Sequence, residues 1–267
     1  MPQVDTNGIR MHYEERGSGD PLLCIMGITA PGAVWELHAQ VWEQHFRCIL
    51  GDNRGVGGSD KPEGPYSSAM MADDYAGLLD ALGIEQVRVA GCSMGGIIAQ
   101  QLALRHPEKV RSAVMMCTWA RCDRYARSIF EHMKDCKARL RPEEFMKWVQ
   151  LLIFTKTFWD NEDGWSGILQ GQSEASLNPD PQPLHALEAQ AAACVDHQTL
   201  DQLGSIRCPV LLTQGREDIF TPYWMAEELH HGIRGSELFV IEKAGHAHHW
   251  EDLEAFNGKT TEWLLAH

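Results

Sequence analysis

Three side chains have the types and the chain order that nucleophilic acyl transfer requires. Ser93 lies in a G-x-S-x-G pattern, Asp218 follows a later apolar run, and His246 follows the last such run. A serine hydroxyl is a poor nucleophile at neutral pH, so it needs a histidine to take its proton and a carboxylate to orient that histidine. The sequence therefore predicts a catalytic triad with Ser93 as nucleophile, His246 as general base and Asp218 as the supporting acid.

The segment around Ser93, VRVAGCSMGGIIAQQLALRH, has a strand-like run before the serine and a helix-like run after it. Gly91 and Gly95 stand two positions to either side, where small residues let the backbone pass close to its neighbours in a strained strand-to-helix turn. The N-terminus of the following helix favours negative charge on a bound substrate. The alternative is a tight turn that needs small residues and contains the serine by coincidence.

Neighbouring residues offer alternatives for the acid and the base. Glu217 directly precedes Asp218, and His248 and His249 follow His246 closely. Acid and base must both stand at the carboxyl ends of strands for the triad to assemble. The short loop after the last strand favours His246, and we expect His248 and His249 to line the mouth of the pocket or to lie on the surface.

The elements that must position these residues alternate between short apolar runs and amphipathic stretches, which is typical of an α/β fold. Residues 9–15 alternate like a half-exposed antiparallel strand. Continuous apolar strands, buried on both faces of a parallel sheet, are predicted at 21–27, 47–52, 86–93, 110–117, 208–215 and 236–242. Helices are predicted at 33–46, 67–83, 95–106, 222–232 and 253–267.

Residues 121–205 break this alternation, because they contain helix-like runs and a proline-rich connection but no convincing buried strand. The sheet resumes near Cys208. We therefore predict a helical cap at 121–205, inserted into an α/β core formed by residues 1–120 and 206–267. The alternative is a pair of ordinary crossover helices joined by a long loop.

Composition and charge limit the partners. With 44% hydrophobic and 22% charged residues, the chain is typical of a globular protein. A formal net charge of -14 argues against a nucleic-acid partner. No run reaches the roughly 18 apolar residues of a membrane span, and the first residues lack the pattern of a signal peptide. The eight cysteines show no CxxC spacing, so we expect buried thiols in a cytoplasmic protein, with the oligomeric state left open.

The sequence resembles the α/β-hydrolase family over nearly its whole length. The similarity rests on CIMGITAPGAVW, DNRGVGGSDKP, GCSMGG, GREDIFTP and AGHAHHWED, together with the triad order Ser, Asp, His. It implies an α/β-hydrolase fold: a mostly parallel central sheet flanked by helices, with the cap inserted after the sixth strand. It also implies an oxyanion hole formed by the backbone N–H groups of Ile28 and Met94. Met26 and Cys92 depart from the family's common residues at their positions, which blurs the subfamily.

Within that family the chain is most similar to small esterases and lactonases of the 3-oxoadipate enol-lactonase type and to polyketide methylesterases. Dehalogenases and epoxide hydrolases are similar but carry aspartate where this chain has Ser93, which excludes them. The resemblance implies hydrolysis of a small-molecule carboxylic ester or lactone without metal or organic cofactor. Carbon–carbon bond hydrolysis, amide hydrolysis and a non-catalytic ligand receptor stay open as alternatives. Candidates for an apolar substrate pocket are Met26, Trp119, Phe154, Phe158, Trp159, Trp165 and Phe220.

Overall fold

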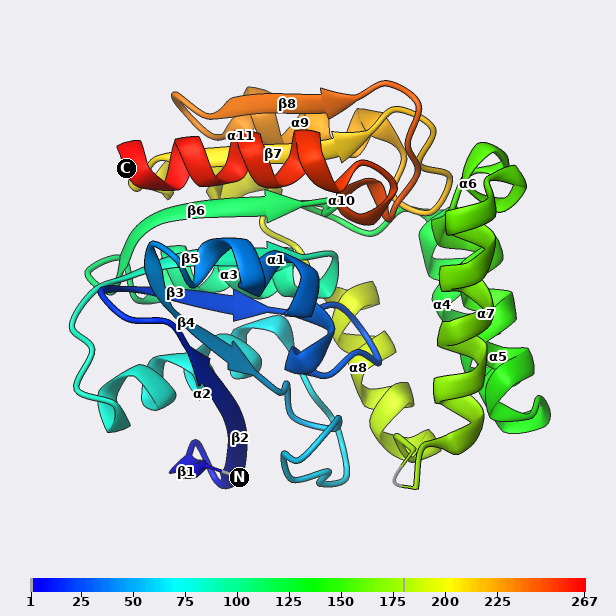
Figure 1. Ribbon diagram of the computed structural model, residues 1–267. Coiled ribbons are helices and arrows are strands. Elements are labelled where there is room, and N and C mark those ends of the chain that lie inside the picture. The colour runs from blue at the N-terminus through cyan, green and yellow to red at the C-terminus, as the bar shows by residue number, and fades with distance from the viewer. Residues whose placement is uncertain (1, 180) are drawn as a thin grey trace.

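An eight-stranded sheet forms the centre of the molecule (Figure 1). The computed structural model describes residues 2–179 and 181–267. The strand order is β1-β2-β4-β3-β5-β6-β7-β8, in which β2 pairs antiparallel with β1 and β4 and the other neighbours pair parallel. The strands are β1 (Gln3–Thr6), β2 (Ile9–Arg16), β3 (Asp20–Ile25), β4 (Phe46–Gly51), β5 (Val87–Cys92), β6 (Val110–Met116), β7 (Val210–Gly215) and β8 (Glu237–Ile241). The predicted mostly parallel sheet is confirmed.

The parallel strands are mainly apolar because the sheet has an apolar layer on each face. Along β3, Leu22 and Cys24 face one layer, and Leu23 and Ile25 face the other. Every residue of β5 and β7 is buried, whereas β8 lies at the sheet edge and is partly exposed. The continuous apolar runs in the sequence therefore reflect burial from both sides.

Helices cover both faces of the sheet (Figure 1). Side chains of α1 (Glu36–Trp42) and α11 (Leu253–Ala266) pack in one apolar layer. Side chains of α2 (Ser68–Ala81), α3 (Met94–Arg105) and α9 (Tyr223–Gly232) pack in the other. The three-layer arrangement leaves the carboxyl ends of the parallel strands as the edge where loops meet, which is where open α/β sheets bind ligands.

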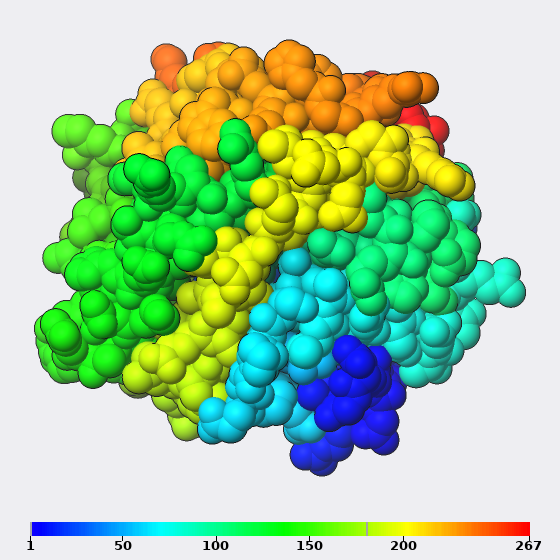
Figure 2. Space-filling model, turned by 180° about the vertical axis from the view of Figure 1, so that it is seen from behind, coloured from blue at the N-terminus to red at the C-terminus, as the bar shows by residue number. Residues whose placement is uncertain are grey.

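The cap stands beyond these carboxyl ends (Figure 1). It follows β6 and consists of α4 (Arg124–Arg139), α5 (Pro142–Ile153), α6 (Lys156–Asp160), α7 (Glu162–Leu177), α8 (Leu184–Asp196) and the 3-10 helix η2 (Leu200–Ser205). Among the described residues of this stretch no strand forms, and a single bridge pairs Arg121 with Gln198. In Figure 2 the yellow-green to yellow segment that contains α8 lies between the green cap helices and the cyan residues of the core. The predicted helical insertion after the sixth strand is therefore present.

Three elements differ from the sequence-based expectation. The edge strand β1 was not predicted, because four residues are too few to show a period. The predicted helix at 33–46 divides into the 3-10 helix η1 (Gly32–Trp35) and α1, and Phe46 already begins β4. A short helix, α10 (His248–Glu251), follows the last strand and reorients the residues after His246.

Candidate active site

Ser93 occupies a strained turn between β5 and α3. Its backbone has φ 54° and ψ −113°, a conformation that residues other than glycine rarely adopt. A Cβ atom at Gly91 would overlap the Gly95 carbonyl, and one at Gly95 would overlap the Ile25 carbonyl. The two glycines of the sequence pattern therefore permit the turn that presents the serine.

Neighbouring backbone holds this turn in place. The Ser93 N–H donates to Met116 O at 2.9 Å, and the Thr118 hydroxyl donates to Ser93 O at 3.0 Å. In the part of the chain that the structure describes, Ser93 Oγ itself has no hydrogen-bond partner. Ser93 is 5% exposed, and its backbone is held in position while its hydroxyl oxygen has no protein partner.

Asp218 lies in the loop after β7 with its carboxylate completely surrounded by donors. Oδ1 accepts the Phe220 and Thr221 N–H groups at 2.8 Å each. Oδ2 accepts the Thr221 hydroxyl at 2.8 Å and the Gln214 amide at 2.9 Å. Because both backbone N–H groups bind Oδ1, the carboxylate is held with Oδ2 facing the imidazole of His246.

His246 Nδ1 lies 2.9 Å from Asp218 Oδ2, which confirms that the loops after β7 and β8 meet. Burial raises the pKa of Asp218, but the charge of His246 and hydrogen bonds from His246 and Thr221 outweigh it and leave that pKa below its ordinary value. An ionised carboxylate accepts only, so Nδ1 carries a proton and Nε2 is left as the basic nitrogen.

Thr221 connects this acid–base pair to the serine turn. Its hydroxyl lies 3.0 Å from His246 Nδ1 and 3.1 Å from Cys117 O, and Cys117 precedes the threonine that bonds Ser93. The three predicted residues therefore stand at the carboxyl ends of β5, β7 and β8 on shared supports. No hydrogen bond joins Ser93 Oγ to His246 among the described residues, and catalytic contacts of this type often tighten only when substrate binds.

The alternative acid and bases are placed elsewhere. Glu217 is exposed, and its backbone N–H donates to Ala244 O. The expectation that His248 and His249 line the pocket mouth or the surface is wrong, because their exposures are 0% and 2%. The helix α10 begins at His248 and turns both rings inward, so that His248 Nε2 lies 2.9 Å from Thr213 Oγ1.

His249 belongs to a buried polar chain beneath the serine turn. Its Nδ1 lies 2.9 Å from His38 Nε2, and its Nε2 lies 3.6 Å from Cys92 Sγ. Burial lowers the pKa of His38 and of His248 to about 4. Burial, together with the neighbouring histidines, also lowers the pKa of His249 well below its ordinary value. These imidazoles are neutral structural groups, so His246 stays the predicted general base.

Two backbone N–H groups near Ser93 are free to bind an oxyanion. Met94 is the first residue of α3, where helical N–H groups have no partner within the helix. Within the described chain, neither the Met94 nor the Ile28 N–H donates a hydrogen bond. Ile28 follows Gly27, at which a Cβ would lie 3.3 Å from Ser93 Cβ, so the loop after β3 passes directly beside the serine.

The pocket candidates separate into groups. Trp119 and Phe220 are buried, and Phe130, which was not among the candidates, joins them with ring centroids 5.7 and 5.2 Å away. Phe220 lies 5.0 Å from the His246 ring, so this aromatic row reaches the base. Met26 is also buried, next to Gly27.

The remaining four candidates lie in the cap and contact one another in pairs. Phe154 stacks on Phe158 with centroids 4.5 Å apart, and Trp159 lies 5.8 Å from Trp165. Trp165 is 42% exposed. No ring contact joins these four to His246 in the described structure, so their place in a pocket stays a prediction.

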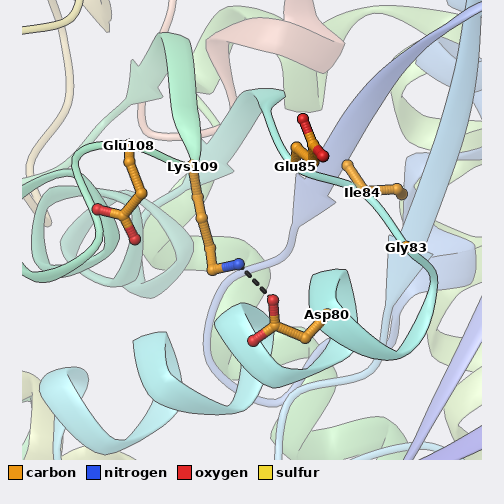
Figure 3. Close-up of a pocket in the computed structure, with 6 residues that line it drawn as sticks. All are labelled: Asp80, Gly83, Ile84, Glu85, Glu108 and Lys109. Carbon is orange, nitrogen blue, oxygen red and sulfur yellow. Dashed lines mark hydrogen bonds and ion pairs between the residues drawn. The ribbon is translucent and has the colours of Figure 1, made fainter.

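The described residues form no second site of another common type near Ser93. No group of histidine, cysteine, aspartate or glutamate side chains among the described residues is arranged to hold a metal ion. No described helix has the length and apolarity that crossing a bilayer requires. A surface hollow of about 380 Å³ is lined by Asp80, Gly83, Ile84, Glu85, Glu108 and Lys109, with Lys109 paired to Asp80 (Figure 3). Because Glu85 and Lys109 precede β5 and β6, that hollow lies at the amino ends of the strands, away from Ser93.

Comparisons with known proteins agree with this geometry. A family profile described as alpha/beta hydrolase fold matches residues 20–253. A relative named as a candidate carbamate hydrolase, RutD, from Azorhizobium caulinodans is 29% identical over 257 residues, 96% of each chain. A thermophilic esterase from Thermogutta terrifontis superposes with TM-score 0.87 at 25% identity, covering 100% of this chain and 99% of that one. The enol-lactonase of Burkholderia xenovorans LB400 has TM-score 0.89 at 21% identity, covering 99% and 100%, and shows the fold alone.

Proposed function

Because the chain belongs to the α/β-hydrolase fold family and the relatives named above include a hydrolase and an esterase, we propose that it is a serine hydrolase that cleaves a carboxylic ester or a lactone. The observation that carries the proposal is the 2.9 Å contact between His246 Nδ1 and Asp218 Oδ2, beside the strained turn of Ser93. An acid-supported imidazole next to a serine hydroxyl that has no other hydrogen-bond partner is the arrangement that activates a serine.

The first half of the proposed reaction forms an acyl-enzyme. Ser93 Oγ attacks the substrate carbonyl carbon while His246 Nε2 takes the hydroxyl proton. The carbonyl oxygen becomes an oxyanion and accepts the Ile28 and Met94 N–H groups, and each such donor is typically worth about 3–4 kcal/mol in the transition state. The intermediate then collapses, and His246 gives its proton to the departing alkoxide.

The second half repeats these steps with water. His246 Nε2 takes a proton from a water molecule that attacks the acyl carbon, and the tetrahedral intermediate again binds the two N–H groups. Ser93 leaves with the proton returned by His246, and the carboxylic acid is released. Asp218 stays ionised throughout, because its pKa is held low by the imidazole and by the hydrogen bonds of Thr221.

The substrate expected from the surroundings is a small molecule with an apolar part. The row of Trp119, Phe130 and Phe220 provides aromatic surface beside His246. Apolar walls with a few convergent polar groups are typical of small-molecule sites. For a lactone, the departing alkoxide stays attached to the acyl group, so the same residues serve without change.

The experiment is a comparison of the wild-type chain with Ser93→Ala on p-nitrophenyl esters and simple lactones, together with labelling by a fluorophosphonate. We expect Ser93→Ala to abolish labelling and to lower kcat by at least about 10³-fold. Ser112→Ala is the matched control, because Ser112 is another buried serine and its hydroxyl has no partner in the described structure. It should change neither readout.

The alternatives give different results in the same experiment. A folded wild-type chain that neither reacts with the fluorophosphonate nor turns over any substrate would contradict catalysis and favour a ligand receptor. Turnover of vinylogous diketones alone would identify a carbon–carbon hydrolase, and turnover of amides or carbamates alone would identify an amidase. Each of these outcomes would overturn the ester and lactone assignment.

A further inference from the structure

Gln190 is a fully buried residue of the cap helix α8 whose side chain reaches two loops of the core. Its exposure is 0%. Oε1 accepts the Thr29 N–H at 3.1 Å, and Nε2 donates to Arg54 O at 2.8 Å. Gln182, just before α8, donates to the same Oε1 at 2.9 Å and thereby orients the amide. One cap side chain therefore bonds directly to the residue that follows Ile28.

Thr29 needs this support because its backbone is strained. Its φ is 69°, in the left-handed region that is unfavourable for a β-branched residue. Such conformations cost about 1–3 kcal/mol and persist only where surrounding contacts impose them. The hydrogen bond from the Thr29 N–H to Gln190 is one of those contacts, and losing it would let the peptide rotate toward a relaxed conformation.

Residues of the core hold the loop after β3 on the N-terminal side of Ile28, at Met26. Asn53 Nδ2 donates to Met26 O at 2.9 Å, and the Tyr75 hydroxyl donates to Asn53 Oδ1 at 3.0 Å. The Ile28 N–H thus stands between one anchor from the core at Met26 and one from the cap at Thr29. The orientation of this donor requires both anchors.

The helix that carries Gln190 is itself seated closely on the core. A Cβ at Gly55 would lie 3.2 Å from Ala186 Cβ, and one at Gly64 would lie 3.1 Å from Ala189 Cβ. These small residues let α8 approach the loop after β4, in the position that Figure 2 shows between cap and core. The helix that carries Gln190 is therefore packed closely against the core.

We propose that Gln190 is a positioning residue of the reaction, which holds the loop after β3 so that the Ile28 N–H points at the oxyanion. This inference rests on the proposed function. Gln190 touches no reacting atom, and its effect passes through Thr29. The competing explanation is that Gln190 only fastens the cap to the core.

The experiment compares three variants on p-nitrophenyl butyrate and with a fluorophosphonate. Gln190→Met keeps the size of the side chain but removes the acceptor for Thr29. Gln190→Glu keeps an acceptor there, and in its protonated form also keeps a donor for Arg54 O. Gln150→Met is the matched control, because Gln150 is a buried cap glutamine that donates to Ile168 O at 3.0 Å and, among the described residues, has side-chain hydrogen bonds only within the cap.

If Gln190 positions the donor, Gln190→Met lowers kcat and the labelling rate at least about ten-fold with KM within about three-fold, since the loss falls on the transition state. Gln190→Glu recovers most of the loss, and Gln150→Met stays within about two-fold of wild type. A folded Gln190→Met variant with wild-type kcat would overturn the inference, as would a rise in KM alone. If Gln190→Met does not fold, a ten-fold loss of kcat in folded Gln190→Glu overturns it, and near wild-type kcat supports it.

Failure of the inference and failure of the proposed function are distinguishable here. If wild type and Ser93→Ala behave alike toward the fluorophosphonate, the serine mechanism itself fails. If Ser93→Ala loses labelling but Gln190→Met does not slow it, only the role of Gln190 fails. Thermal melting of each variant separates loss of fold from loss of rate.

Discussion

Replacement of Asp218 by asparagine should inactivate the protein by reversing the proton on His246. Oδ1 of Asp218 accepts two backbone N–H groups, so the amide oxygen of asparagine must occupy that position. The amide nitrogen then replaces Oδ2 and points a donor at His246 Nδ1, 2.9 Å away. Nδ1 becomes an acceptor, the proton moves to Nε2, and the imidazole has no lone pair to offer Ser93.

The expected magnitude follows from this tautomer change. When the carboxylate of a serine triad is replaced by an amide with the geometry kept, kcat falls by about 10⁴-fold. At 1.36 kcal/mol per factor of ten, that corresponds to about 5.4 kcal/mol of transition-state stabilisation. The fold should survive, because the neutral amide removes a buried charge. The Gln214 amide N–H would, however, face the new amide N–H in place of Oδ2, and the loss of this hydrogen bond should lower the free energy of unfolding by about 1–3 kcal/mol.

The assay is kcat on a p-nitrophenyl ester together with the rate of fluorophosphonate labelling, with thermal melting as the check of folding. Glu217→Gln is the control, because Glu217 is the adjacent, exposed acid and should leave both rates unchanged. A folded Asp218→Asn variant within about ten-fold of wild type would refute the assigned role of Asp218. A large loss in Glu217→Gln would transfer the role to that residue.

Two further predictions concern stability. Gly95→Ala should destabilise the fold by about 3 kcal/mol, the upper end of typical overpacking, because its Cβ meets the Ile25 carbonyl. Gly258→Ala, exposed on α11 with nothing near its Cβ, should instead gain about 0.5–1 kcal/mol, and equal urea midpoints for the two variants would contradict this. Burial lowers the pKa of His38 and His248 from 6.5 to about 4, so the unfolded state binds more protons between these values. The free energy of unfolding should therefore fall as the pH drops from about 6.5 toward 4, by up to about 1.4 kcal/mol per pH unit for each histidine, and a flat profile of urea midpoints would contradict the burial.

Much of the fold was predictable because strands that are buried on both faces appear in a sequence as short apolar runs. The predicted strand at 86–93 is β5 (Val87–Cys92), and the predicted helix at 95–106 is α3 (Met94–Arg105). The strand is a mainly apolar run that contains one charged residue, Arg88, and the helix is a periodic run that ends shortly before Pro107. The strand β1 shows no such run, because it is short and lies at the edge of the sheet.

The site was predictable where chemistry dictates a local pattern and not where distant segments meet. The turn at Ser93 needs glycines at fixed offsets, so it can be found by its spacing. His248 and His249 were placed wrongly because three histidines within four residues look alike, and only the helix α10 turns the latter two inward. Gln190 carries no signal in an alanine-rich helix, and its partner Thr29 is 161 positions away.

The cap forms hydrogen bonds with two core loops near Ser93, the loop after β3 and the loop after β8. Through Gln190 it bonds the loop after β3, which carries the proposed oxyanion donor. At its other end, Ile153 O accepts the Ala247 N–H at 2.9 Å, directly after the proposed base. Glu251 adds a carboxylate that accepts N–H groups from the cap and from the loop after β8. The loops that carry the proposed donor and the proposed base are therefore both bonded to one insertion, so the cap belongs to the framework that holds these two loops.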